Sequence, residues 1–308
     1  MPPPPSSRRR RLLAATGRSL LAMPLLGLAA CRPRGDAPAA ASGDTAATDG
    51  AAWASGGTGR IGDPARFPDP FATAPAAACV LTCTTTIGPC HAESPERSDV
   101  SDGWDGLPLR LALRVVDADC APVEGALVEI WHTNHTGGYS GRIAAMCNND
   151  ADDLGKRFFR GYQRSDADGR VAFDTCYPGW YRGRAVHIHL RVLTGGYEAA
   201  DDAPAAVTTQ LLFSDALNQE IFSSHPLYAG FGLPDTGLDD DNVVGGEADK
   251  SPYLFDVQRL DDGVMLASKT LVVQREAGPP ACRVQGAGGP GGPGGRGGPP
   301  PGPPPDAG

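Results

Sequence analysis

The sequence predicts an all-β protein, a β-sandwich carried between two segments of different composition. Short runs rich in Val, Ile and Leu recur through the middle of the chain, and Gly, Pro and Asp separate them. That pattern is typical of a sandwich or barrel. Long amphipathic helical periods are absent, and the one helix that we expect is a short one near 213–222.

Six segments have the character of strands. The run "LRLALRVVDAD" alternates along its length and then ends in a polar turn, and the other segments are β-branched or apolar. The expected strands lie within 109–119, 125–133, 166–175, 185–193, 205–213 and 267–274. Asp166, Asp168 and Gly169 resemble part of a calcium loop, but no Glu follows at the required offset. A hairpin turn is therefore expected there.

The first 30 residues have the layout of an export signal. Four arginines, Arg8–Arg11, precede an apolar run over 20–30 that is too short to span a bilayer comfortably. The arginines resemble a twin-arginine signal, and "LAAC", which ends at Cys31, resembles a lipobox. We expect an exported protein, periplasmic or at the cell surface, held to the membrane only by lipid on Cys31. Plain secretion with cleavage near Ala30 is the alternative.

Two segments of biased composition flank the sandwich domain, which we place at 76–277. Residues 31–75 are rich in Ala, Gly, Asp, Pro and Thr and predict a flexible tether. Residues 278–308 carry Gly and Pro without a strict triplet, which predicts a disordered tail and not collagen. Removing residues 1–30 takes away five arginines and no acidic residue, so the formal charge moves from −9 to −14. Nucleic-acid binding is not expected of so acidic a protein.

The chain has eight cysteines, which is ordinary for an exported protein of this size and high for a cytosolic one. We expect up to three disulfides among six of them: Cys79, Cys83, Cys90, Cys120, Cys147 and Cys176. Cys282 lies in the tail and is expected to be free. A metal site in the run C-x3-C-x6-C is the alternative to disulfides there.

Two of the six histidines stand two residues apart on an expected strand. Alternate side chains leave the same face of a strand, so His187 and His189 can hold one metal ion. A solvated strand face would give the same pattern. Tyr181 lies six residues before His187, behind a Pro-Gly turn that can aim its phenol at the strand. A phenolate is a hard ligand, which suits Fe(III) better than it suits zinc or copper. Tyr139, in a Gly-rich loop after another strand, is a candidate second phenolate.

Three segments together resemble the intradiol ring-cleavage dioxygenases, the relatives of catechol and protocatechuate dioxygenases. They are "GALVEIWHTNHTGGYSG", "FFRGYQRSDADGRVAFDTCYPGWYRGRAVHIH" and "TTQLLF", and the resemblance covers residues 79–275. It implies a non-haem Fe(III) bound by four ligands: Tyr139, Tyr181, His187 and His189. It further implies that Arg184 is the active-site arginine, whose charge would stabilise negative charge developing on the substrate, and that Gln210 lies beside the site. A surface salt bridge and strand packing are the alternative roles of these two residues.

The activity that the resemblance implies is cleavage of a catechol-type ring between its two hydroxylated carbons. The partners are a catechol-type substrate and dioxygen, both oxygen atoms enter a cis,cis-muconate-type product, and no external reductant is needed. By analogy with the family, Tyr181 leaves the iron when substrate binds and takes up a phenolic proton. A twin-arginine route carries folded proteins, so iron could be loaded before export.

The chain also departs from the family. The loop from Tyr181 to His187 is short, and Ala185 follows the arginine where the cytoplasmic enzymes carry Pro. Narrow substrate selectivity is therefore in doubt, and the oligomeric state is open because no N-terminal helical segment is evident. Two other classes stay open: a non-catalytic surface β-sandwich that binds without chemistry, and a zinc or copper protein that uses only the histidine pair.

The remaining histidines and one acidic run are not expected to bind the metal ion. His132 and His135 could line the pocket near Tyr139, whereas His91 and His225 are expected at the surface. The acidic run 239–241 is expected to be a solvated loop. Trp131, within an apolar strand, is expected in the core.

Overall fold

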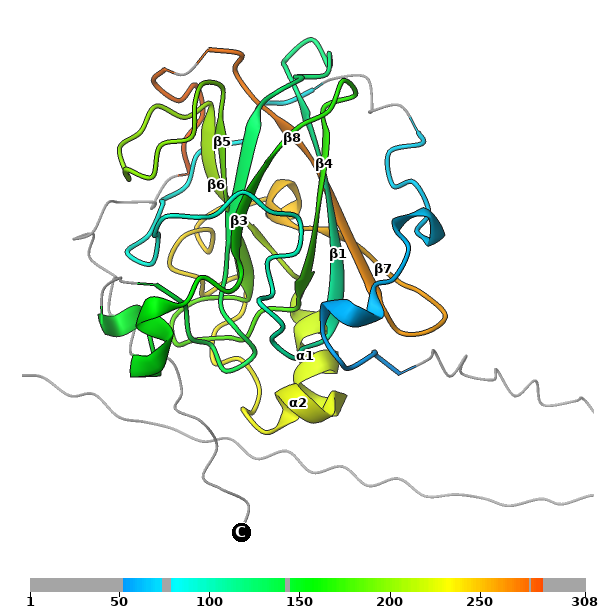
Figure 1. Cartoon of the computed structure of the whole chain (residues 1–308). Coiled ribbons are helices and arrows are strands. Elements are labelled where there is room, and N and C mark those ends of the chain that lie inside the picture. Colours follow the sequence, from blue (N-terminus) through cyan, green and yellow to red (C-terminus); the bar gives the residue numbers. More distant parts are fainter. Residues whose placement is uncertain (1–51, 74–78, 142–144, 277, 285–308) are drawn as a thin grey trace, which may run out of the picture. The chain divides into compact units, whose positions relative to one another are not determined.

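The computed structural model describes residues 52–73, 79–141, 145–276 and 278–284. The export signal over 1–30 and the lipobox cysteine lie outside the described residues. In the part that is described, eight strands form two four-stranded sheets of a β-sandwich (Figure 1). The strands are β1 (Pro108–Val116), β2 (Leu127–Trp131), β3 (Arg160–Arg164), β4 (Arg170–Cys176), β5 (His187–Leu193), β6 (Val207–Leu212), β7 (Asp256–Arg259) and β8 (Met265–Val272).

The first sheet has the order β4-β1-β8-β7, and the second has the order β3-β2-β5-β6. Strands β1 and β8 run parallel, and every other neighbouring pair is antiparallel. The core lies between the sheets, because alternate residues of β1 and β5 are apolar and fully buried there. These residues are Leu109, Leu111, Leu113, Val115, Ile188, Leu190 and Val192.

The predicted fold class is confirmed, and each of the six expected strands is present. Strands β3 and β7 were not predicted, because "RGYQR" and "DVQR" are polar and show no apolar alternation. The turn at Asp166–Gly169 is also present, and the Gly169 N–H donates to the Asp166 carbonyl at 2.9 Å. It is not a hairpin turn within one sheet, because the flanking strands β3 and β4 belong to different sheets.

The expected short helix is α1 (Asp215–Ser224), followed by α2 (Pro226–Ala229). The Ser214 hydroxyl accepts from the Leu217 N–H and begins α1, and Pro226 begins α2 because proline favours the first helical turn. Both helices lie at one end of the sandwich (Figure 1). Short 3-10 turns lie at Thr58–Arg60, Pro64–Arg66, Ala145–Cys147, Ala151–Gly155 and Ser251–Tyr253. None of the helices in the described ranges is long and apolar enough to cross a membrane.

The outer face of the second sheet is buried, although it carries polar residues. The segment 83–91 lies over this face: the Thr85 N–H donates to Thr208 O at 2.9 Å, and Gln210 Nε2 donates to Thr86 O at 2.8 Å. His91 Nε2 lies 3.1 Å from Glu129 Oε1 on β2. Burial of polar groups is costly unless they are paired, so this covered face is an unusual environment within the fold.

Three disulfides join the described cysteines: Cys79–Cys120, Cys83–Cys282 and Cys90–Cys147. The number agrees with the expectation, but two of the assignments were wrong. Cys282 is bonded and not free, whereas Cys176 is a buried free thiol. Composition placed Cys282 in the tail, but Val284 beside it is buried and its N–H donates to Thr84 O.

The packed part of the chain therefore extends beyond the predicted boundaries at both ends. Residues 278–284 were assigned to the tail, and residues 52–73 were assigned to the tether. Trp53 and Ile61 are nonetheless buried, and Trp53 Nε1 donates to Glu220 Oε1 at 2.8 Å. Isolated apolar residues in Gly- and Ala-rich surroundings have no periodicity, so the sequence did not reveal this packing.

Candidate metal centre

Strand β5 brings His187 and His189 to the covered outer face. The two residues between and after them, Ile188 and Leu190, face the core, so strand alternation sends both imidazoles the other way. Both rings are almost fully buried, and their Nε2 atoms lie 3.1 Å apart. Trp131 of β2 stands opposite His189 in the ladder, and the two rings stack at 4.8 Å between centroids. Trp131 was expected in the core; it is buried, but on this covered face with Tyr139 and the Cys90–Cys147 disulfide, and not between the sheets.

Tyr139 and Tyr181 reach the same point from two loops. The Tyr139 N–H donates to Cys147 O at 2.8 Å, which fixes its loop against the Cys90–Cys147 disulfide. The Pro-Gly turn before Tyr181 is held to the same loop, because the Gly179 N–H donates to Asn134 O at 2.9 Å. The two phenol oxygens lie 3.4 Å apart.

The four donor atoms converge on one point. From His187 Nε2, the Tyr181 oxygen is 3.2 Å away, the Tyr139 oxygen is 3.4 Å away, and His189 Nε2 is 3.1 Å away. His187 Nδ1 lies 2.6 Å from Ala185 O, so the ring proton sits there and Nε2 offers a single lone pair. One lone pair cannot accept three good hydrogen bonds.

A cation fits this arrangement better than a hydrogen-bond network does. Donors bound to one ion at typical metal–ligand lengths lie roughly 2.9–3.4 Å from each other, for bond angles from a right angle to tetrahedral. The observed separations of 3.1–3.4 Å fall in that range. His189 Nδ1 is buried without a hydrogen-bond partner, so only Nε2 of that ring meets other polar groups. The donor set of two phenols and two imidazoles therefore fits a single hard metal ion.

Burial sets the protonation of these groups. It lowers the pKa of His187 to about 3, with a further contribution from the Arg184 charge, and it lowers the pKa of His189 well below its usual value. Both imidazoles are therefore neutral and ready to act as ligands. Burial raises the pKa of Tyr139 well above its usual value, so this phenol ionises near neutral pH only when a cation is bound beside it.

Arg184 and Gln210 lie next to the four donors and contact each other. Arg184 Nη2 donates to Gln210 Oε1, and Gln210 stands opposite His189 in the β5–β6 ladder. Arg184 Nε donates to Asp241 Oδ2 at 3.0 Å. This ion pair is buried, so Arg184 does not form a surface salt bridge.

Asp241 is the residue that the sequence interpretation missed. It was expected in a solvated acidic loop, but its side chain is fully buried. Burial would raise its pKa, but the Arg184 charge and the backbone hydrogen bonds from Val244 and Ala185 together outweigh this effect and lower the pKa, so the carboxylate is ionised. The run "DDD" gave no sign of which of its members turns inward.

Two other expectations about histidines were wrong. His91 and His225 were expected at the surface, but both are buried. His91 lies between Asp201 and Glu129, and His225 Nε2 lies 3.0 Å from Ala54 O. His132 and His135 are engaged elsewhere: His132 Nε2 lies 2.7 Å from Thr175 Oγ1, and the His135 ring lies 5.8 Å from that of Trp104.

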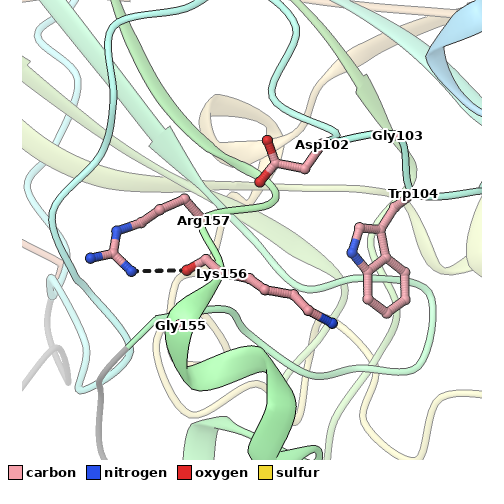
Figure 2. Close-up of a pocket in the computed structure, with 6 residues that line it drawn as sticks. All are labelled: Asp102, Gly103, Trp104, Gly155, Lys156 and Arg157. Carbon is pink, nitrogen blue, oxygen red and sulfur yellow. Dashed lines mark hydrogen bonds between the residues drawn. The ribbon is translucent and has the colours of Figure 1, made fainter.

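A surface pocket of about 660 Å³ contains none of the four donors. Figure 2 shows the residues that line it, with the Lys156 side chain extending toward the Trp104 ring. The Lys156 Nζ lies 5.8 Å from the centre of that ring, and Arg157 donates to the Lys156 carbonyl at 2.9 Å. Asp102 is the one acidic residue among those that line this pocket, so its lining differs from the donor set of the buried cluster.

Comparison with known proteins agrees with this geometry. A family model described as "Dioxygenase" matches residues 89–193, a range that contains all four donors. The structure of an intradiol ring-cleavage dioxygenase from Tetranychus urticae is similar, with a TM-score of 0.54 and 26% identity over 64% of this chain and 96% of that one. Intradiol ring-cleavage dioxygenases are thus the proteins that this chain resembles in both sequence and fold.

Two ring-cleaving dioxygenases are among the curated proteins that are similar to this chain. A 6-chlorohydroxyquinol 1,2-dioxygenase from Cupriavidus pinatubonensis is 30% identical over 140 residues, which is 38% of this chain and 48% of that protein. A catechol 1,2-dioxygenase from Acinetobacter lwoffii is 30% identical over 139 residues, again 38% of this chain and 48% of that protein. The chain thus spans about half the length of the curated relatives that it matches.

Proposed function

We propose that this protein is a non-haem Fe(III) dioxygenase that cleaves catechol-type rings between the two hydroxylated carbons to give cis,cis-muconate-type products. The observation that carries the proposal is the convergence of Tyr139, Tyr181, His187 and His189 at separations of 3.1–3.4 Å. When bound, Fe(III) would hold the catechol and make it reactive toward dioxygen. A zinc or copper site would have no need of two phenols.

The two tyrosines are placed for different roles. Tyr139 is enclosed, whereas Tyr181 is half-buried and follows a short turn. The more exposed phenol is the better candidate to leave the metal when a catechol enters. Once free, the Tyr181 phenolate oxygen would accept a phenolic proton from the substrate, which is general-base catalysis by a side chain within reach of the reacting group.

Arg184 supplies the fixed positive charge of the site. Its guanidinium is buried and ion-paired, and the Tyr139 and Tyr181 phenols lie close enough for its charge to act on them. In a water-poor site such a charge stabilises negative charge that develops on the bound substrate more strongly than it would in bulk water. Gln210 orients the guanidinium from the other side.

The decisive experiment is a visible absorption spectrum of the purified, iron-reconstituted protein before and after catechol is added without oxygen. We expect a broad tyrosinate-to-iron band that shifts as catechol binds. Admission of dioxygen should then consume one dioxygen for each cis,cis-muconate that forms. A protein that stays colourless after reconstitution would contradict the proposal and favour a binding module.

We further propose that the enzyme is exported and held to the membrane by lipid on Cys31, with the twin-arginine-like signal over 1–30 as the route. The three disulfides among the described cysteines support an oxidising compartment. Fractionation of cells that produce the full chain tests this: the protein should be found with the membranes, and Cys31→Ala should release it. Equal amounts of both forms in the cytoplasm would refute export.

A further inference from the structure

The Asp241 carboxylate is saturated with hydrogen bonds. Oδ2 accepts from Arg184 Nε at 3.0 Å and from the Ala185 N–H at 2.8 Å. Oδ1 accepts from the Val243 N–H at 2.9 Å and from the Val244 N–H at 3.0 Å. The side chain is fully buried, and that of Arg184 is 11% exposed. A carboxylate held by backbone groups on one side presents a fixed acceptor to the guanidinium on the other.

The guanidinium is therefore held at two of its corners. Nε is fixed by Asp241, and Nη2 donates to Gln210 Oε1. Gln210 is anchored in turn, because its Nε2 donates to Thr86 O at 2.8 Å. Two fixed acceptors define both the position and the plane of the rigid fork. The third corner, Nη1, donates no hydrogen bond to any of the described residues, and so it remains available to a substrate.

Asp241 also reaches the histidine pair through the backbone. The same Oδ2 that accepts from Arg184 accepts from the Ala185 N–H, and the Ala185 carbonyl accepts from His187 Nδ1 at 2.6 Å. One carboxylate oxygen thus holds both Arg184 and the backbone that leads from it to His187. Partners that orient a ligand in this way influence how firmly it is held.

We propose that Asp241 is the positioning residue of the site: its carboxylate aims the Arg184 guanidinium at the bound substrate. The inference rests on the proposed function, and it assigns a role to a residue that the family resemblance did not mark. Asp241 does not touch substrate itself, so its effect passes through Arg184. It also neutralises the buried arginine, which would otherwise be an uncompensated charge.

The test is a double-mutant cycle on the iron-loaded full chain. Asp241→Asn keeps the size of the side chain and removes its charge, and Asp240→Asn is the matched control because Asp240 is the exposed neighbour. We expect Asp241→Asn to lower kcat/KM for catechol on the order of 10²-fold, the loss typical of a misplaced catalytic group. Asp240→Asn should leave it unchanged. In an Arg184→Gln background, Asp241→Asn should lower kcat/KM by no more than about threefold.

If the double variant loses kcat/KM by the product of the two single-variant factors, the inference is overturned, because Asp241 then acts independently of Arg184. Wild-type turnover by Asp241→Asn would do the same. If Asp241→Asn does not fold, Arg184→Lys decides: it keeps the charge but lacks the fork, and it should lose activity about as severely as Arg184→Gln. Near wild-type turnover by Arg184→Lys would show that the orientation of the guanidinium is unimportant and would refute the positioning role of Asp241.

The cycle also separates this inference from the proposed function. Iron content and the visible band are recorded for every variant, and the catechol dissociation constant is measured without oxygen. If the wild-type protein binds catechol but forms no muconate, the proposed function fails, and the coupling between Asp241 and Arg184 is then read from the dissociation constants. If the wild-type protein is active and the cycle is additive, only the positioning role fails.

Discussion

Gly88 offers a direct test of whether His189 must keep its position. Its φ is +73°, and a Cβ built on it would lie 3.2 Å from His189 Cε1. The ring cannot move away freely, because Trp131 stacks on it with an interplanar angle of 10°. Gly88→Ala should therefore displace the ring by a few tenths of an ångström and disturb the donor atom on the same ring.

The size of the effect has two parts. A non-glycine residue with positive φ costs about 1–2 kcal/mol, and this cost lowers the free energy of unfolding with or without metal. The contact with His189 adds a loss of metal affinity, which for groups that support a ligand is typically about 10–100-fold. Gly125→Ala separates the two parts, since Gly125 has φ +74° and a Cβ added to it would meet no atom within 4 Å.

The assay compares iron retention in a chelator titration, the intensity of the visible band, and the melting temperature. Both variants should lose similar stability, and only Gly88→Ala should lose iron, by about tenfold in apparent affinity. Equal iron retention by Gly88→Ala and Gly125→Ala would refute the claim that His189 is a ligand whose position matters.

Three further predictions follow from the covered face. Tyr139→Phe should remove much of the visible band of the iron-loaded protein, as seen by absorption spectroscopy, whereas Tyr162→Phe should leave it intact. Burial alone would raise the pKa of Glu129, but its partners His91 and Arg191 outweigh burial and lower it. The ionised carboxylate therefore stabilises the fold above pH 4.5, its ordinary pKa. This stabilisation is lost as the pH falls through the lower pKa of the folded state. Urea unfolding between pH 7 and pH 3 should show this loss in the wild-type protein, and Glu129→Gln should abolish it while costing about 3–5 kcal/mol at pH 7. The Cys90–Cys147 disulfide joins residues 57 apart in the sequence, so replacing both cysteines should lower the free energy of unfolding in urea by about 4 kcal/mol. An unchanged midpoint of unfolding would contradict this prediction.

Local patterns were enough to predict the fold and the placement of some of the candidate donors. The alternation of β1 and β5 is a property of a few adjacent residues, so it predicted both the strands and the shared face of His187 and His189. The Pro-Gly turn before Tyr181 is equally local. Tyr139 lies 42 residues from Tyr181, and no local pattern joins them. Its loop made Tyr139 a candidate, and the family resemblance implied that the two tyrosines share one site.

Interactions that depend on the tertiary structure were not visible in the sequence. Asp241 lies in a run of three acidic residues, and only the folded chain turns this one toward Arg184. Cys282 lies in Gly- and Pro-rich surroundings, and its partner Cys83 is 199 residues away. His91 was assigned to the surface because nothing near it in the sequence indicates the Glu129 carboxylate that it meets. In each case the partner comes from a distant segment.

The covered face of the second sheet explains why four particular groups point to a cation. Buried polar groups normally have partners of complementary kind. Glu129 is paired with Arg191, and Arg184 is paired with Asp241. The four phenol and imidazole groups do not follow this rule, because the His187 lone pair faces three other donor atoms at 3.1–3.4 Å and cannot serve them all. A positive ion is the partner that would satisfy every one of these atoms at once.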